Sequence, residues 1–220
     1  MENEIISFTM RELFELGGVV MWPLLFFSIV VVFISLERLV YFLFHNRRMD
    51  DLTSVVSEHL ARNDISGAEE YLGKLTKRRM GARVLLELVK NSRSKGKRAF
   101  SEHRVERAIE AEATVCITSL EAGMNFLTAL GSLSPLTGFL GTVTGMIGAF
   151  RSIAEATEVN AQIVANGIYE ALITTVFGLI VAIIAMISHS IFTHLIDKFA
   201  FDVEKNCSLL ISEIVEQNEA

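Results

Sequence analysis

Three long runs without charged side chains constrain this 220-residue chain more than any other feature. Residues 17–36 and 122–150 contain no Asp, Glu, Lys or Arg, and residues 159–196 contain only Glu170. A helix needs about 20 mostly apolar residues to cross the hydrocarbon core of a bilayer, so each run is long enough to span a membrane. Because 51% of the residues are hydrophobic and 21% are charged, the sequence predicts an all-α integral membrane protein with three transmembrane helices.

The distribution of basic residues predicts the orientation of these helices. Between His45 and Leu127 lie 15 of the 20 Lys and Arg residues, so the positive-inside rule places this segment in the cytoplasm. The N-terminus is then expected outside and the C-terminal tail inside. The predicted segments are an external N-terminus (1–16), a first transmembrane helix (17–44), a cytoplasmic helical domain (45–121), a second transmembrane helix (122–150), a short external loop (151–160), a third transmembrane helix (161–196) and a cytoplasmic helical tail (197–220).

The second and third helices are expected to extend beyond the membrane. The 38 residues of 159–196 would measure about 57 Å as a helix, against about 30 Å for a hydrocarbon core. Residues 101–121 contain no Gly or Pro and run directly into the second uncharged run. Between them and the first helix, residues 49–91 read as a small helical domain, in which Ser66 to Glu69 has the form of a capping box.

Composition and spacing argue against several classes of function. A net charge of −6 is unlike that of a nucleic-acid binder, and the basic cluster at 93–98 is expected to be a solvated turn. Two cysteines and five histidines lack the spacing of a metal site. No nucleotide-binding or nucleophile motif is present either. We therefore expect no enzyme, no cofactor, no bound metal and no nucleic-acid partner.

A stripe of glycines follows one face of the second predicted helix. Its members are spaced by three, four and three residues: Gly138, Gly141, Gly145 and Gly148. Small residues let two helix backbones approach closely in lipid, and helix packing alone explains this stripe. It does not explain the hydroxyls of Thr137, Thr142 and Thr144 beside it. Each threonine alone is expected to be structural, and only their grouping indicates a polar path.

The third predicted helix carries the sharper feature, Glu170. Thr174 and Gly178 follow it at i+4 and i+8, with Thr175 at the edge of that face, whereas the bulky residues around Ile173 are expected on the opposite side. An ionisable group inside a membrane is costly unless it faces a cavity or a partner, so a functional role is favoured. The alternative is a carboxylate that reaches water at the interface. One Glu and several hydroxyls can pass a cation, but directional transport also requires a switching group from a partner.

The chain resembles the MotA/TolQ/ExbB family, and within it the three-span ExbB/TolQ branch. Residues 134–150 (SPLTGFLGTVTGMIGAF) and 167–179 (GIYEALITTVFGL) carry the resemblance, with 17–24 (GGVVMWPL) and Glu37-Arg38 similar to the family's first span. The resemblance covers all three spans and their order. The cytoplasmic segment matches in placement and size more than in residues.

This resemblance implies a pentameric ring in the bacterial inner membrane, with the external side facing the periplasm. Inside the ring it implies a dimeric partner of the ExbD/TolR type, whose single transmembrane helix carries an aspartate, and it suggests a TonB/TolA-like protein as a further partner. Flow of cations, usually protons, would drive movement that performs work at the outer membrane. Carried over by position, Thr142 and Thr175 would line the pore beside Glu170.

Two positions depart from the family pattern. Thr174 stands where many relatives have alanine, and Ile184 replaces a proline that is common later in the third span. A second hydroxyl adds an oxygen ligand, which hard cations favour, so Thr174 joins the predicted ion pathway and sodium is an alternative to the proton. A flagellar or gliding-type stator is the nearest alternative function, although flagellar stators typically have four spans. A scaffold that never conducts is an alternative from a different class.

Overall fold

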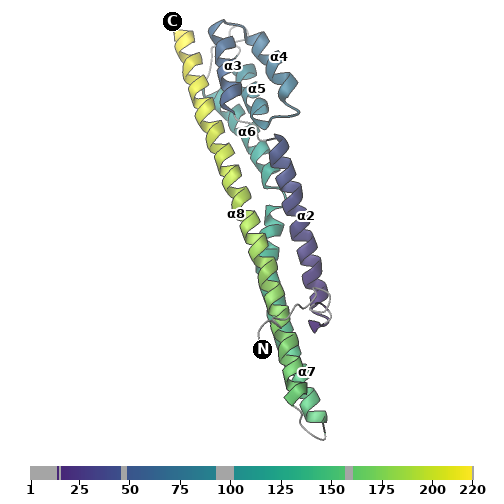
Figure 1. Cartoon of the computed structure of the whole chain (residues 1–220). Helices are drawn as coiled ribbons and strands as arrows, with labels where there is room; N and C mark the ends of the chain where they lie inside the picture. The colour runs from purple at the N-terminus through teal and green to yellow at the C-terminus, as the bar shows by residue number, and fades with distance from the viewer. Residues whose placement is uncertain (1–13, 15, 46–48, 93–101, 157–160, 220) are drawn as a thin grey trace, which may run out of the picture. The chain divides into compact units, whose positions relative to one another are not determined.

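The computed structural model describes residues 14, 16–45, 49–92, 102–156 and 161–219, and within these ranges every regular element is a helix. The helices, labelled in Figure 1, are α2 (Met21–His45), α3 (Asp50–Ala61), α4 (Ile65–Leu75), α5 (Met80–Ser92), α6 (Glu102–Glu121), α7 (Met124–Glu155) and α8 (Ala161–Glu219). Three helical stretches are long and apolar enough to cross a membrane: Met21–Phe44, His103–Glu155 and Ala165–Glu216. The predicted all-α membrane fold with three such helices is confirmed. The basic cluster at 93–98 lies outside the described residues.

The chain forms two compact units that share helices α2 and α8. Unit 1 consists of Met1–Leu36 and Gly123–Ser190, and unit 2 consists of Glu37–Ala122 and Ile191–Ala220. Helix α8 contains 59 residues and therefore measures about 88 Å, nearly three times the thickness of a hydrocarbon core. Its length alone carries it beyond a bilayer.

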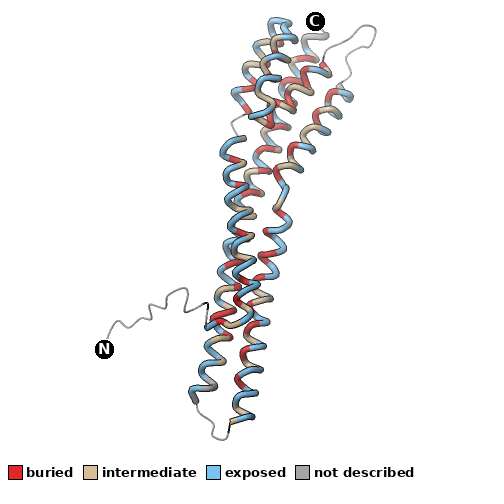
Figure 2. Tube along the Cα trace, turned by 90° about the vertical axis from the view of Figure 1, so that its right-hand side faces the viewer, coloured by how far each residue is buried: buried red, intermediate tan, exposed pale blue. Residues whose placement is uncertain are grey.

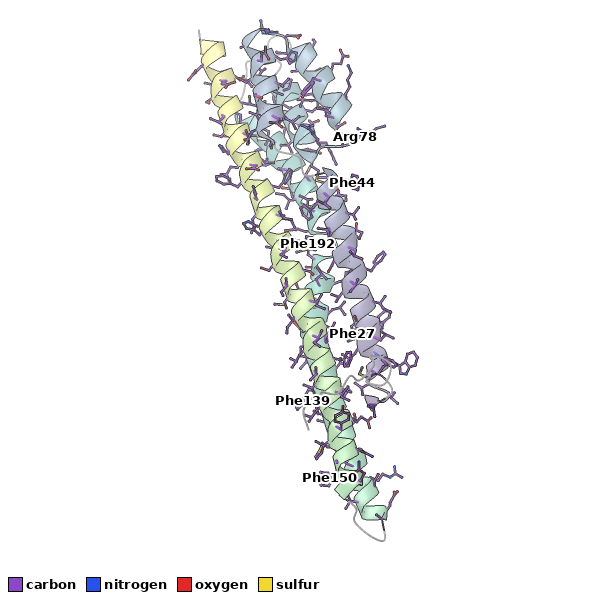
Figure 3. All side chains as sticks on the ribbon, in the orientation of Figure 1. Phe27, Phe44, Arg78, Phe139, Phe150 and Phe192 are labelled. Carbon is purple, nitrogen blue, oxygen red and sulfur yellow. The ribbon has the colours of Figure 1, made fainter. Side chains whose placement is uncertain are left out.

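Unit 1 contains α7, the first part of α8 and the first part of α2. Ile173 of α8 is 8% exposed because Met21 and Leu24 of α2 pack against it. The bulky side of α8 is therefore a packing surface at Ile173, since α2 covers the helix there. Bulky residues elsewhere do point outward: Leu172 and Ile183 of α8 are exposed, as are Phe139 and Phe150 of α7 (Figure 3).

The exposure pattern of α7 and α8 fits a membrane environment. Buried residues recur along one side of each helix, and exposed residues occupy the other sides (Figure 2). The exposed sides of unit 1 are rich in Leu, Ile, Val and Phe. In lipid, apolar side chains face outward at no cost while helices satisfy their own backbone hydrogen bonds. The surface of unit 1 is therefore compatible with a bilayer and not with water.

Unit 2 is built on a small bundle of α3, α4, α5 and α6, together with the end of α8. Fully buried residues such as Leu52, Leu85 and Leu210 supply its core from α3, α5 and α8. Polar contacts between these helices include Ser57 Oγ, which donates to Glu213 at 2.8 Å, and Arg83, which pairs with Glu112 at 2.6 Å. Burial of apolar surface, at about 25 cal/mol per Å², stabilises this unit more than these partly exposed contacts do.

Helix α4 begins with a different cap from the one that the sequence indicates. Asp64 is the N-cap residue, and its Oδ1 accepts a hydrogen bond from the Gly67 N–H at 2.9 Å. Ser66 lies inside the helix, so the capping-box interpretation of Ser66 and Glu69 is wrong. Aspartate is at least as good an N-cap as serine, and it stands one residue before the helix.

The helical stretch that leads into the second span is interrupted. Helix α6 ends at Glu121 and α7 begins at Met124, with Gly123 in the left-handed region at φ 83°. Helices α6 and α7 together still form one stretch that is long and apolar enough to cross a membrane, His103–Glu155, and this break lies within it. Interruption of a helix frees carbonyl groups at its end, and Arg38 of α2 satisfies two of them. Its Nη1 donates to Ser119 O at 3.1 Å and to Leu120 O at 3.3 Å.

Candidate functional site

Glycines bring the backbones of α7 and α8 into direct contact inside unit 1. A Cβ atom added at Gly138 would lie 2.8 Å from Thr174 O, and one added at Gly178 would lie 2.6 Å from Ser134 O. Both neighbours are backbone atoms, which cannot move aside independently. At these two positions only glycine fits, and the helices approach as closely as small-residue packing in membranes allows.

The same contact continues along the pair in both directions. Gly145 lies against Ala171 and the Gly167 carbonyl, each 3.2 Å from the position of an added Cβ. Gly167 in turn faces Ala149, and the sequence reasoning did not include it among the packing residues although it belongs to the conspicuous 167–179 segment. The sequence could have indicated Gly167 as a packing residue, because it lies three residues before Glu170 and on the same small-residue face as Ala171 and Gly178.

Two of the predicted packing glycines differ in their surroundings. At Gly141 an added Cβ would meet the Thr174 side chain, so Thr174 occupies the space that this glycine leaves open. At Gly148 no described heavy atom lies within 4 Å of an added Cβ. Gly148 therefore belongs to a surface that is open within the described chain, and the other four glycines line the α7–α8 contact.

The threonine hydroxyls all donate to backbone carbonyls. Thr175 Oγ1 donates to Gly138 O at 3.1 Å, Thr174 Oγ1 to Ala171 O at 2.8 Å, and Thr142 Oγ1 to Phe139 O at 2.7 Å. A hydroxyl that has donated its hydrogen keeps lone pairs that accept a hydrogen bond or coordinate a cation. Thr174 is 1% exposed, whereas Thr142 and Thr175 are half-buried. Of the three threonines of the predicted ion pathway, Thr142 and Thr175 are thus accessible and Thr174 is not.

Glu170 lies beside the turn that precedes α2. Its carboxylate fills the space next to Gly18, whose φ is 66°, so that an added Cβ there would collide with Glu170 Oε1. Glu170 is half-buried, and no donor among the described residues reaches its carboxylate. An ionisable side chain with neither full hydration nor a partner is energetically unfavourable in a membrane. No hydrogen bond from the described residues therefore offsets the cost of placing this carboxylate here.

The structure does not bring Glu170 and Thr175 to one point within a single chain. Five residues of helix separate them, which places their side chains about 140° apart around α8. Accordingly, Thr175 contacts Gly138 on α7, whereas Glu170 contacts Gly18 before α2. They flank the glycine contact from its two edges. Among the described residues there is also no group of three or more His, Cys, Asp or Glu that could hold a metal ion.

Comparison with known protein sequences identifies relatives of this chain. Over 89 residues the chain is 40% identical to the Tol-Pal system protein TolQ of Pseudomonas aeruginosa, covering 40% of this chain and 38% of that protein. Over 115 residues it is 34% identical to the biopolymer transport protein ExbB of Salmonella typhimurium, covering 52% of this chain and 46% of that protein. The matches thus span less than half the length of these two relatives.

A third relative matches over most of both chains. The putative biopolymer transport protein ExbB-like 3 of Synechocystis is 32% identical over 181 residues, which cover 81% of this chain and 82% of that protein. The sequence profile of the MotA/TolQ/ExbB proton channel family matches residues 76–205, which include all of α6, α7 and the site residues. This multi-pass membrane protein belongs to the MotA/TolQ/ExbB proton channel family.

Proposed function

We infer that the protein is a subunit of an ion-driven motor of the ExbB/TolQ type, with Glu170, Thr142 and Thr175 in its ion pathway. The observation that carries this inference is the half-buried Glu170 without a donor among the described residues, on a helix that belongs to a proton channel family. A structural carboxylate whose hydrogen bonds are all made within its own chain needs no further partner, whereas Glu170 requires a cation, water or a group from another chain. Transport is the chemistry that uses such a group inside a membrane.

The separation of Glu170 from Thr175 supports an assembly of several subunits. The two groups lie at opposite edges of the α7–α8 contact, so one chain does not enclose a continuous polar path. Neighbouring copies can bring the Thr175 edge of one subunit toward the Glu170 edge of the next. We propose the pentameric ring that the family resemblance implies, around a dimeric ExbD/TolR-like partner whose aspartate supplies the switching group.

The proposed setting is the bacterial inner membrane, with the N-terminus in the periplasm and the C-terminus in the cytoplasm. Two of the relatives are named for the Tol-Pal system and for biopolymer transport. We therefore propose that cation flow is coupled to work at the outer membrane, with a TonB/TolA-like protein as the recipient of that work. The proton is the proposed ion and sodium the alternative, since Thr174 adds an oxygen near Thr175. No further cofactor is proposed.

Flux measurements on reconstituted protein test this proposal. Proteoliposomes that contain the subunit and an ExbD/TolR-like partner are given either a proton gradient or a sodium gradient. Glu170→Ala and Thr175→Val are expected to lower the flux at least tenfold without changing the mass of the complex. Thr128→Val is the matched control, because the Thr128 hydroxyl also donates to its own helix, at Met124 O, and Thr128 belongs to none of the hydroxyl groups predicted to form a polar path.

The results separate the candidate functions. Flux under one gradient that both variants abolish identifies the ion and supports the motor subunit. Wild-type flux in both variants contradicts the proposed path. An assembled complex that conducts under neither gradient indicates the non-conducting scaffold, for which the tight glycine contact of α7 and α8 is the supporting observation.

A further inference from the structure

A groove in unit 2 lies between α6 and α8 and is not part of the ion pathway. It has a volume of about 570 Å³. Ile109 of α6 and Val203 and Ile211 of α8 form its apolar floor, and each is less than 10% exposed. Three exposed glutamates stand at its rim: Glu106 and Glu110 on α6, and Glu204 on α8. The groove therefore suits an occupant that presents apolar side chains flanked by positive charge.

Helix α8 itself carries a surface of that description on another face. Phe201 is 64% exposed and Leu209 is 51% exposed, and the exposed Lys198 and Lys205 lie on the same face as these two residues. At 100° per residue, the four side chains fall within about 80° of one another around the helix. No carboxylate of the described residues pairs with either lysine. We call this set of four residues the basic-apolar stripe.

The groove and the basic-apolar stripe both contain apolar residues, carry opposite charges, and face different directions. The groove side of α8 is centred about 120° away from the stripe, so one chain cannot place its own stripe in its own groove. Two different, complementary patches on one molecule produce head-to-tail association, which closes into a ring when the rotation permits. Phe201 and Leu209 would cover the apolar floor, and Lys198 and Lys205 would face the three glutamates.

We propose that the basic-apolar stripe of one subunit occupies the α6–α8 groove of the next subunit. This inference rests on the ring proposed above and specifies which surfaces join its members in unit 2. Aromatic and aliphatic anchors that enter an apolar site provide most of the affinity in such contacts, and the surrounding charges fix the partner and the register.

Charge reversal in the full-length protein tests the contact. Lys205→Glu would face the glutamates with a negative charge, and Glu110→Lys would face the lysines with a positive one. Each is expected to raise the dissociated fraction several-fold at low ionic strength, as measured by native mass spectrometry, because like charges repel across the contact. In a ring every interface contains both positions, so the double variant restores opposite charges and is expected to return the wild-type mass. Lys77→Glu, at an exposed lysine outside both surfaces, is the control.

Cross-linking tests the same contact and leaves the two lysines of the basic-apolar stripe unchanged. In a chain with Cys116 and Cys207 replaced by alanine, Phe201→Cys and Glu110→Cys are combined and treated with a bifunctional maleimide. Products of two, three and more chains are expected on a denaturing gel. Val115→Cys combined with Phe201→Cys is the control, because Val115 is 51% exposed and lies on the opposite side of α6 from the groove. It is expected to give single chains.

The outcomes distinguish failure of the contact from failure of the ring. Loss of mass in the single reversals, its recovery in the double variant, and the cross-linked products together support the contact. A ring that persists in both single variants and gives no cross-linked products overturns the contact and leaves the ring intact. A monomeric wild-type protein overturns both. The charge-reversal variants keep both native cysteines, so they test the contact alone if the cysteine-free parent does not assemble.

Discussion

Single glycines decide how closely α7 and α8 approach, because at Gly138 and Gly178 the atoms opposite are backbone atoms. The side chain of Thr174 occupies the space that Gly141, which has no side chain, leaves open. The spacing of glycines predicted a smooth face on α7. It could not show that Thr174 is sealed in the contact while Thr175, the next residue, is half-buried, since this depends on where α8 meets α7.

Substitution at Gly178 is expected to destabilise the protein strongly. Gly178→Val introduces a Cβ that would lie 2.6 Å from Ser134 O, so the helices must separate, and we expect a loss of about 1–3 kcal/mol. Thermal unfolding in detergent measures this loss. Gly73→Ala is the control, because no described atom lies within 4 Å of an added Cβ in that part of α4. It is expected to be neutral or to stabilise α4 by up to about 1 kcal/mol, and equal melting temperatures for the two variants would contradict the packing argument.

The cap of α4 is expected to depend on pH. The Gly67 N–H, and then the His59 side chain, lower the pKa of Asp64 below its ordinary value. A carboxylate whose pKa falls on folding contributes stability that is fully present above its unfolded pKa, about 3.9, and is lost as the pH falls through the folded pKa. Asp64→Ala is expected to raise hydrogen exchange in the first turn of α4 several-fold at pH 7, and its effect is expected to shrink as the pH falls through the folded pKa of Asp64.

The matched variant for this cap is Asp64→Asn. An amide oxygen caps a helix without titrating, so this variant should keep the protection of wild-type protein at pH 7 and retain it at pH 3. Protection that falls equally with pH in wild-type and Asn variants would show that Asp64 is not the titrating group.

At the scale of helices, the junction of α6 and α7 is the feature that sequence reasoning missed. Gly123 was visible, but glycine is frequent inside transmembrane helices, so a single glycine in an apolar run does not by itself indicate a helix end. The carbonyl groups freed at the end of α6 accept hydrogen bonds from Arg38, a residue about 80 positions earlier, and no local sequence pattern indicates this contact. By contrast, local spacing predicted that residues 49–91 form short helices, without giving the bounds of α3, α4 and α5, and it indicated the wrong capping residue for α4.

Loss of the Arg38 guanidinium is expected to weaken this junction. Arg38 also donates to the Glu37 carboxylate at 2.6 and 3.0 Å, and its side chain is 11% exposed. Arg38→Met removes both carbonyl contacts and leaves Glu37 without its partner, at an expected cost of about 3 kcal/mol. Hydrogen exchange across 119–126 should rise in this variant. Arg38→Lys should recover only part of the protection, because an ammonium group lacks the planar fork of donors; full recovery would show that charge alone is sufficient.

For the whole molecule, charge distribution predicted the number and order of the membrane-crossing helices correctly. It worked because the absence of charge over about 20 residues is a physical requirement of the bilayer and not a preference. The boundaries of the two units follow the same signal. Unit 1 includes residues up to Leu36, where the first uncharged run ends, and residues up to Ser190, six residues before the third run ends at Ile196. The contacts that join distant segments within each unit were not predictable from composition.

Trp22, the single tryptophan of the chain, provides a test of how unit 1 lies in the membrane. It is 65% exposed near the start of α2 and meets Phe14 edge to face, with ring centroids 5.3 Å apart. Tryptophan favours the interface between headgroups and hydrocarbon, so lipids brominated close to the headgroup should quench its fluorescence more than lipids brominated near the chain end. Phe33→Trp in a Trp22→Phe background moves the probe about 16 Å along α2 and should reverse this order. The same order at both positions would contradict a membrane-crossing α2.

The shared helices also fix the order in which the chain can complete its structure during synthesis. Unit 1 needs residues up to Ser190, and unit 2 needs the residues from Ile191 onward. Chains emerge from the ribosome at about 5–20 residues per second, N-terminus first. Helices α3 to α5 can therefore associate early, but the core of unit 2 stays incomplete until its buried residues from α8, Leu210 and Ile214 among them, have been synthesised. A ribosome that stops after Ser190 would release a chain with every residue of unit 1 and with an open core in unit 2, which is the form most exposed to proteases and chaperones.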